Sequence, residues 1–145
     1  LTAHRLLLKK TGIADNTATD VITVTIPNAN HAAAIKLTFL SSNGSTDAFE
    51  SSRCAEGLVV LARTTGVAVV AVAATLDLTQ IATVAAGATH TLAYAVSAIT
   101  GAVGASNSFT ITVTIDDSGN LGSNQVIVLA ELINSEATGV TMAAA

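Results

Sequence analysis

The side chains that could carry chemistry in this sequence are three histidines, one cysteine and a small number of carboxylates. His4, His31 and His90 lie in three separate segments, without the short spacings that join zinc ligands. The single Cys54 has no partner for a disulfide within the chain, and a small buried or half-buried thiol is the usual role of such a residue. No GxSxG nucleophile elbow is present, although a Ser/His/Asp triad assembled only by folding would leave no such motif.

Two polar stretches partly match known ligand loops. DDSGN, from Asp116 to Asn120, offers oxygen ligands for calcium, but it lacks the rest of an EF-hand pattern and is more typical of an acidic hairpin turn. GAVGASN, from Gly101 to Asn107, lies between two expected strands, which does not favour a phosphate loop. The adjacent Asp116 and Asp117 would point to opposite faces of a strand. The sequence therefore predicts no catalytic, cofactor or metal site, and a protein that is not an enzyme.

The elements around these residues are apolar and poor in charge. Of 145 residues, 50% are hydrophobic, 11% charged and 3% aromatic, with a formal net charge of −4 and a mean hydropathy of +0.62. The apolar run GVAVVAVAATL, from Gly66 to Leu76, is shorter than the roughly 20 residues that cross a bilayer, which argues against a membrane span. Few aromatics and an acidic body disfavour nucleic-acid binding.

Basic residues gather at the N-terminus. Arg5, Lys9 and Lys10 are three of the six basic residues, and the first ten positions hold no acid, which leaves three basic against ten acidic residues in the rest of the chain. This separation predicts a basic N-terminal arm over residues 1–12 and a single β-sandwich domain over residues 13–145. A solvated, disordered end is the alternative interpretation of the same residues.

Period-two alternation predicts strands through most of the chain. In SFTITVTIDD, apolar residues from Phe109 to Ile115 alternate with threonines, as in a strand with one buried face. Clusters of Asn, Gly, Asp and Ser separate such segments. The expected architecture is all-β, an antiparallel β-sandwich or jelly roll of about eight strands. The expected strands are Val21–Ile26, Ala33–Leu40, Leu58–Arg63, Val67–Thr75, Thr79–Ala85, His90–Ile99, Phe109–Ile115 and Val126–Ile133.

Two segments leave a helix open. TVAAGATHTLAYAV is rich in alanine, the best helix former, although its threonines and valines favour a strand. Asp47–Glu56 has no clear period and is compatible with a short helix.

Two of the expected strands have apolar side chains on both faces. Val67–Thr75 and Val126–Ile133 would each leave one apolar face exposed in a monomer, which soluble monomers rarely tolerate. The pattern therefore predicts an oligomer. Its expected interface contains Val67, Val69, Val70, Val72, Val126 and Val128.

Three segments resemble a group of small tailed-phage virion proteins. They are TGIADNTATDVITVTIPNANHAAAI (Thr11–Ile35), GAVGASNSFTITVTI (Gly101–Ile115) and VLAELINSEATGVTM (Val128–Met142). Such proteins are similar to capsid decoration, or cement, proteins and to head fibres. The resemblance weakens from Ser41 to Gly57. It implies a β-sandwich or jelly roll that assembles as a homotrimer on a capsid lattice, with the major capsid protein as its partner.

Under this resemblance the basic arm is expected to dock on the capsid through Arg5, Leu6, Leu7, Leu8, Lys9 and Lys10, which combine charge with apolar area. The expected role is non-enzymatic stabilisation of the capsid surface of the virion, after synthesis in the host cytoplasm. The alternative is a tail or head-fibre module that binds a receptor or glycan, for which Tyr94 and three phenylalanines supply few stacking rings. A small hydrolase is a further alternative.

Overall fold

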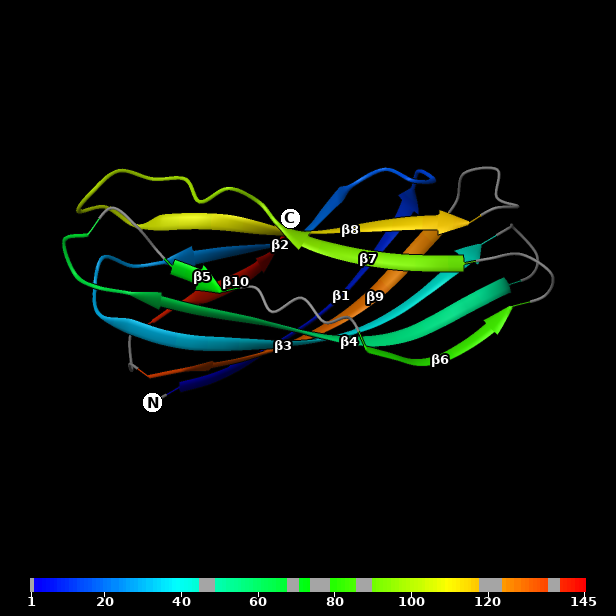
Figure 1. Ribbon diagram of the computed structural model, residues 1–145, viewed down its shortest axis with the longest axis horizontal. Coiled ribbons are helices and arrows are strands. Elements are labelled where there is room, and N and C mark those ends of the chain that lie inside the picture. Colours follow the sequence, from blue (N-terminus) through cyan, green and yellow to red (C-terminus); the bar gives the residue numbers. More distant parts are fainter. Residues whose placement is uncertain are drawn as a thin grey trace.

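The computed structural model describes residues 2–44, 49–67, 71–73, 79–85, 90–117, 124–135 and 139–145, and this part of the chain contains strands and no helix. It forms two stacked layers (Figure 1), so the predicted antiparallel β-sandwich is confirmed. Eight of its strands overlap those expected from the sequence, and β1 and β10 are additional. The strands are β1 (Thr2–Ile13), β2 (Thr19–Ile26), β3 (His31–Gly44), β4 (Phe49–Arg63), β5 (Ala71–Ala73), β6 (Thr79–Ala85), β7 (His90–Val96), β8 (Asn107–Asp117), β9 (Asn124–Asn134) and β10 (Thr141–Ala144).

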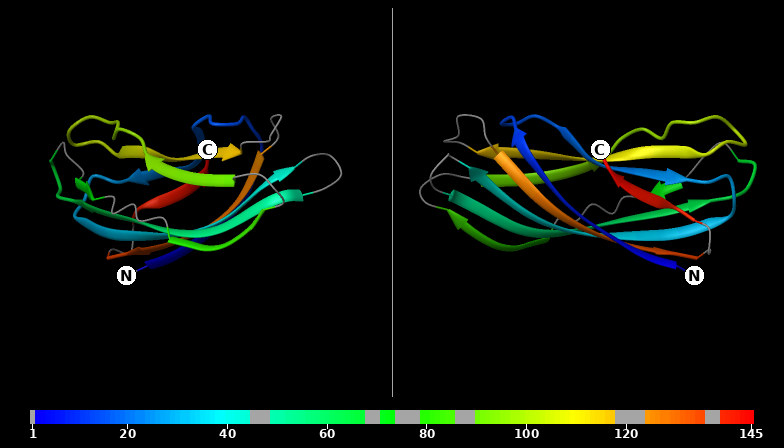
Figure 2. Two further views of the ribbon diagram at one scale, coloured as in Figure 1. Left: turned by 45° about the vertical axis from the view of Figure 1, so that its right-hand side comes forward. Right: turned by 180° about the vertical axis from the view of Figure 1, so that it is seen from behind.

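Both sheets are antiparallel. The six-stranded sheet has the order β1-β9-β3-β4-β5, with β6 pairing with another part of β4, and the four-stranded sheet has the order β10-β2-β8-β7. Pairing is nested, since β1 pairs with β9 in one sheet while β2 pairs with β8 in the other. Figure 2 shows the two layers facing each other from both viewing directions. This arrangement encloses one core between the sheets.

The core is built from alternate side chains of each strand. In β8 every second residue from Asn107 to Asp117 is buried and the threonines between them are partly exposed, so the predicted alternation is confirmed. In β2 both Val21 and Ile22 are buried, although the alternation predicted opposite faces. The pairing of β2 with β8 shifts register at this point, and such a bulge turns two consecutive side chains inward.

Tyr94 of β7 links the two sheets at the centre of the core. Its ring centroid lies 5.4 Å from that of Phe39 on β3. Its hydroxyl accepts a hydrogen bond from the Leu58 amide at 3.0 Å and donates to the Leu58 carbonyl at 3.3 Å. Leu58 lies between the parts of β4 that pair with β5 and β6, so Tyr94 satisfies backbone groups that neither of these described strands reaches. A Cβ at Gly57 would lie 2.5 Å from the Tyr94 ring, so this approach requires glycine.

The predicted N-terminal arm is instead part of the sandwich. Residues 2–13 form β1, which pairs with β9 from Thr2 to Ile13 and is an edge strand of the six-stranded sheet. Without β1, the backbone groups of β9 on this side would have no ladder partner. The prediction failed because three consecutive leucines, Leu6–Leu8, conceal an alternating pattern that pairing with β9 resolves. The described sandwich therefore includes residues 2–12.

The short helix expected over Asp47–Glu56 is wrong in its described part. Phe49–Glu56 belongs to β4, which lies between β3 on one side and β6 on the other. Partners on both sides satisfy its backbone, and tertiary pairing thus overrides a weak local preference. The strand expected over Val67–Thr75 is described as a strand only at Ala71–Ala73, while the Val67 amide closes a turn by bonding to the Thr64 carbonyl at 3.2 Å.

Candidate functional site

The outer face of the six-stranded sheet holds most of the exposed large apolar side chains. We call the outward-pointing residues of β1, β9, β3 and β4 the aliphatic face. Register defines its rows: Leu7 pairs with Leu129, which pairs in turn with Thr38. Side chains of one row point to the same side of a sheet. Its exposed large apolar residues are Leu7, Leu40, Leu58, Val60, Ile127 and Ile133.

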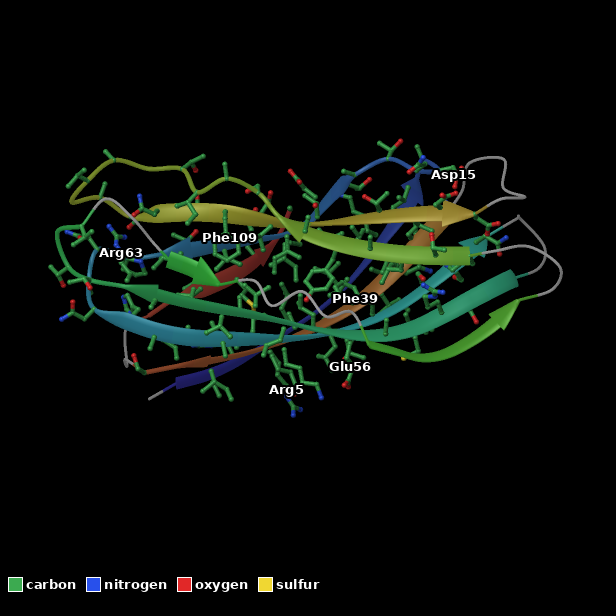
Figure 3. The ribbon with its side chains drawn as sticks, viewed as in Figure 1. Arg5, Asp15, Phe39, Glu56, Arg63 and Phe109 are labelled. Carbon is green, nitrogen blue, oxygen red and sulfur yellow. The ribbon has the colours of Figure 1, made fainter. Side chains whose placement is uncertain are left out.

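Two ion pairs cross the middle of the aliphatic face. Arg5 Nη2 lies 2.9 Å from Glu131 Oε1, and Lys36 Nζ lies 3.0 Å from Glu56 Oε1. The four residues come from four strands, and Figure 3 shows Arg5 and Glu56 pointing away from the core on the same side. Such exposed pairs add little to folding stability. The two pairs do neutralise most of the charge of the aliphatic face, because both partners of each pair belong to the same chain.

Two shallow hollows lie at opposite ends of the aliphatic face. The first, of about 290 Å³, is lined by Lys9, Leu40, Ile127 and a polar group in which Gln125 Nε2 donates to Ser42 Oγ at 3.1 Å. The second, of about 340 Å³, is lined by Leu58 and Ile133 and by three of the ion-paired residues, Arg5, Lys36 and Glu131. Both hollows are mainly apolar, so the face is shaped to receive aliphatic side chains.

The structure divides the predicted docking residues between the two sides of β1. Arg5, Leu7 and Lys9 are exposed on the aliphatic face, whereas Leu6 and Leu8 are partly buried and pack against the core. The six residues therefore do not form one free surface, because adjacent side chains of a strand alternate.

Lys10 makes a hydrogen bond at one edge of the sandwich. Its Nζ donates a hydrogen bond to the backbone carbonyl of Ala145 at 2.9 Å, next to the place where β1 and β10, the edge strands of the two sheets, approach each other. Lysines on an edge strand hinder the addition of another strand. The basic residues of this segment thus have a role within the fold.

The valines predicted to form an oligomer interface do not behave as one group. Val126 and Val128 are fully buried in the core, so the prediction is wrong for them. Val67 is exposed, but it follows the turn after β4. Of the remaining three, only the backbone of Val72, in β5, is described, and Val69 and Val70 lie outside the described residues.

The residues of β9 that point outward were missed by the sequence prediction. Ile127 and Ile133 are exposed, whereas their neighbours Val128 and Leu132 are buried. The signal was present, because NQVIVLAELI is apolar at odd and at even positions. Only pairing with β1 and β3 decides which set faces the core.

The outer face of the four-stranded sheet has a different chemistry. Threonines of β2 and β8 are partly exposed there, and Ala93 and Ala95 of β7 are exposed. The described residues of β10, β2, β8 and β7 include no exposed large apolar side chain. The two exposed large apolar residues that lie outside the aliphatic face, Val67 and Val103, are in connections between strands.

Folding brings together a serine, a histidine and an aspartate that are far apart in the sequence. Ser41 Oγ lies 2.8 Å from His90 Nε2, and His90 Nδ1 lies 3.2 Å from Asp117 Oδ2. With Nδ1–H donating to the carboxylate, Nε2 is left to accept from the Ser41 hydroxyl. These are the contacts of a nucleophile relay. All three residues are buried, with Ser41 at 0% exposure, so the Ser41 hydroxyl is closed to a substrate in this structure.

Hydrogen bonds among Ser41, His90 and Asp117 connect the two sheets at one end of the sandwich. Ser41 lies on β3 of the six-stranded sheet, and the other two lie on β7 and β8 of the four-stranded sheet. Asp15, from the β1–β2 connection, accepts a hydrogen bond from the Asp117 amide at 2.8 Å. The sequence placed His90 on the correct strand but gave no sign of its partners, which come from other elements.

Arg63 performs the corresponding function at the opposite end (Figure 3). Its side chain is buried and donates from Nη1 to the Ile26 carbonyl at 2.8 Å and from Nη2 to the Ala105 carbonyl at 2.6 Å and to Asn28 Oδ1 at 3.2 Å. One guanidinium thereby joins the end of β4 to the connections after β2 and before β8. Both ends of the core are closed by polar side chains that bridge the sheets.

The described residues contain no group of three or more His, Cys, Asp or Glu side chains that could hold a metal ion. In the DDSGN segment, Asp116 and Asp117 are the last two residues of β8, whereas Ser118–Asn120 lies outside the described residues. No helix that could cross a lipid bilayer occurs in this part of the chain.

Comparison with known proteins gives a likeness of fold alone. No protein-family model and no curated protein match the chain. Among solved structures, the tailspike protein of Acinetobacter baumannii phage AM24 is similar, with a TM-score of 0.59 and 13% identity over 97% of this chain and 28% of the tailspike. The tailspike of Acinetobacter baumannii bacteriophage Fri1, described as a capsular polysaccharide depolymerase, has a TM-score of 0.43 and 13% identity over 99% of this chain and 20% of its own. The chain thus spans about a quarter of these tailspikes.

These comparisons correct one expectation from the sequence. The chain was expected not to be an enzyme, but one of its structural neighbours is described as a depolymerase of capsular polysaccharide, which contradicts that expectation. At this similarity the neighbour assigns no catalytic residue to the chain.

Proposed function

We propose that this chain is a structural domain of a phage tail protein of the tailspike type. The observation that carries the proposal is the likeness to the AM24 tailspike, which extends over 97% of this chain and only 28% of the tailspike, as expected for one domain of a longer virion protein. It favours the tail alternative over capsid decoration. Residues 2–13, which the capsid interpretation used as a free docking arm, are instead paired with β9 within the sheet.

Within such a tail protein, the part that we assign to this domain is assembly with other polypeptide surfaces. The aliphatic face supports this role, because soluble monomers rarely expose contiguous apolar patches. Sugar binding by stacking receives no support from Phe39, Tyr94 and Phe109, whose rings are buried. The homotrimer and the contact with a major capsid protein stay predictions from the sequence.

The proposal is tested by locating the chain on virus particles. Antibodies raised against the purified chain, with gold labels, are applied to virions of the phage that encodes it and viewed by electron microscopy. We expect gold at the tail. Gold distributed over the head would favour capsid decoration instead, and absence of the chain from purified virions would contradict both assignments.

A further inference from the structure

We propose that the aliphatic face binds the aliphatic face of further copies of this chain, arranged around an axis parallel to the strands. This names a partner for the proposed virion domain, and it rests on that proposed function only for its biological setting. The same contact is expected between copies of the purified chain.

The apolar content of the face is the first argument. Leu7 is 69% and Ile133 is 60% exposed, and six of the eight exposed large apolar residues in the described chain lie on this one face. Four strands and seven residues give roughly 450 Å² in projection, at about 4.8 Å between strands and 3.4 Å per residue. The accessible area exceeds this projection because side chains stand out from the sheet.

The charges select the kind of partner. Arg5 with Glu131 and Lys36 with Glu56 are paired within the chain, so the centre of the face has little net charge to attract a nucleic acid or a strongly acidic protein. A surface on which both signs alternate from strand to strand, as Arg5, Glu131 and Lys36 do along one row, instead fits another surface with the same alternation. A second copy of this chain presents such a surface.

The register of β9 and β3 makes the face complementary to itself. Glu131 of β9 pairs with Lys36 of β3, and two rows of side chains further on, Ile127 pairs with Leu40. A rotation axis parallel to the strands keeps every row at its height and places the β9 half of one copy against the β3 half of the next. Glu131 then meets Lys36 of the next copy, and Ile127 meets its Leu40. Opposite charges and aliphatic side chains thus coincide in the same arrangement.

Face-to-face contact is also favoured over pairing at the sheet edge. β1 is an edge strand of the six-stranded sheet, opposite the edge formed by β5 and β6, and it carries Lys9 and Lys10, of which Lys10 is bonded to the Ala145 carbonyl. Charged edge strands resist the addition of a further strand. Rotation about the stated axis leaves this edge uncovered and buries the face instead.

The experiment measures mass by sedimentation velocity over a concentration series of the full chain and its variants. We expect the wild type to assemble to a multiple of the 14.4 kDa chain mass, three-fold if the predicted trimer holds. Leu40→Glu places a carboxylate in the apolar part of the contact and is expected to raise the Kd roughly tenfold or more. The matched control Ala93→Glu adds the same charge to the outer face of the four-stranded sheet and is expected to leave the mass unchanged.

Charge exchange tests the register directly. Lys36→Glu alone is expected to weaken assembly, because two carboxylates then meet across the contact. The fourfold variant Arg5→Glu/Glu131→Lys/Lys36→Glu/Glu56→Lys reverses both ion pairs, keeps every charge beside an opposite one, and is expected to restore assembly. Circular dichroism checks that each variant is folded. A monomeric wild type at all concentrations, equal effects of Leu40→Glu and Ala93→Glu, or no rescue in the fourfold variant would overturn the proposal. If gold labels the tail of the virion but the purified chain is monomeric, this inference is wrong and the proposed function still holds.

Discussion

The two outer faces of the sandwich differ, although both sheets supply the same kind of aliphatic side chain to the core. The six-stranded sheet exposes Leu7, Ile133 and other large apolar residues, together with two ion pairs. The four-stranded sheet exposes threonines and small residues such as Ala93. A β-sandwich needs only its inner faces to be apolar. The second apolar surface therefore points to a requirement beyond folding, whereas the threonine surface is typical of a face left in water.

The largest expected effect tests which residues of β9 belong to the core and which to the aliphatic face. Leu132→Ala removes a side chain that is 1% exposed and is expected to lower the free energy of unfolding by about 2–5 kcal/mol. Ile133→Ala, at the next position, is expected to change it by less than about 0.5 kcal/mol in dilute monomer. Urea unfolding of the two variants measures both values. Equal losses would mean that the two faces of β9 are assigned wrongly.

The next effect tests the link that holds the two sheets at their spacing. Gly57→Ala would bring a Cβ to 2.5 Å from the Tyr94 ring, and we expect a loss of roughly 2–3 kcal/mol from this overpacking. Tyr94→Phe is the control, since it keeps the ring and removes only the hydroxyl that bonds to Leu58. Thermal unfolding followed by circular dichroism compares them. A fully stable Gly57→Ala variant would contradict the close approach of Tyr94 to β4.

A smaller effect compares adjacent serines that point to the core and to the aliphatic face. Ser41→Ala deprives the buried His90 Nε2 of its donor and is expected to cost about 1–3 kcal/mol. Ser42→Ala removes an outward hydroxyl that accepts from Gln125 and is expected to cost less than about 0.5 kcal/mol. Chemical denaturation at neutral pH provides the comparison. If Ser42→Ala were the more damaging change, the inward position of Ser41 would be wrong.

The smallest effect sharpens the account of charge on the aliphatic face. A double-mutant cycle with Arg5→Ala and Glu131→Ala is expected to give a coupling energy of about 0.2–1 kcal/mol, because the Arg5 side chain is 78% exposed and the Glu131 side chain 31%. The coupling is expected to fall with added salt. A coupling that is large and insensitive to salt would mean that this pair is already covered in solution.

Strand patterning could be predicted from the sequence where only one face of a strand is apolar. In β8 the threonines between Phe109 and Ile115 mark the outer face without reference to any other strand. In β9 both faces are apolar, and the predicted interface residues Val126 and Val128 proved to be core. Three consecutive leucines in β1 hid its alternation in the same way. The prediction failed where hydropathy has no period of two.

The candidate site was predictable only in part. A surplus of apolar residues predicted a surface beyond the core, but exposed members of the aliphatic face, such as Leu40 and Leu58, lie on strands that the sequence treated as ordinary. The contacts among Ser41, His90 and Asp117 could not be predicted from the sequence. Ser41 and His90 are 49 positions apart, His90 and Asp117 are 27 positions apart, and the three residues meet across two sheets.

The sequence by itself determined that the chain forms antiparallel strands around an aliphatic core, because side-chain alternation is a local property of extended backbone. The tertiary structure decided which apolar residues face inward, that residues 2–13 complete a sheet, and which polar groups meet at the ends of the core. These choices depend on register, and shifting a strand by one residue exchanges its two faces. Register is fixed by partners that lie far away in the sequence, as Leu7 and Leu129 do.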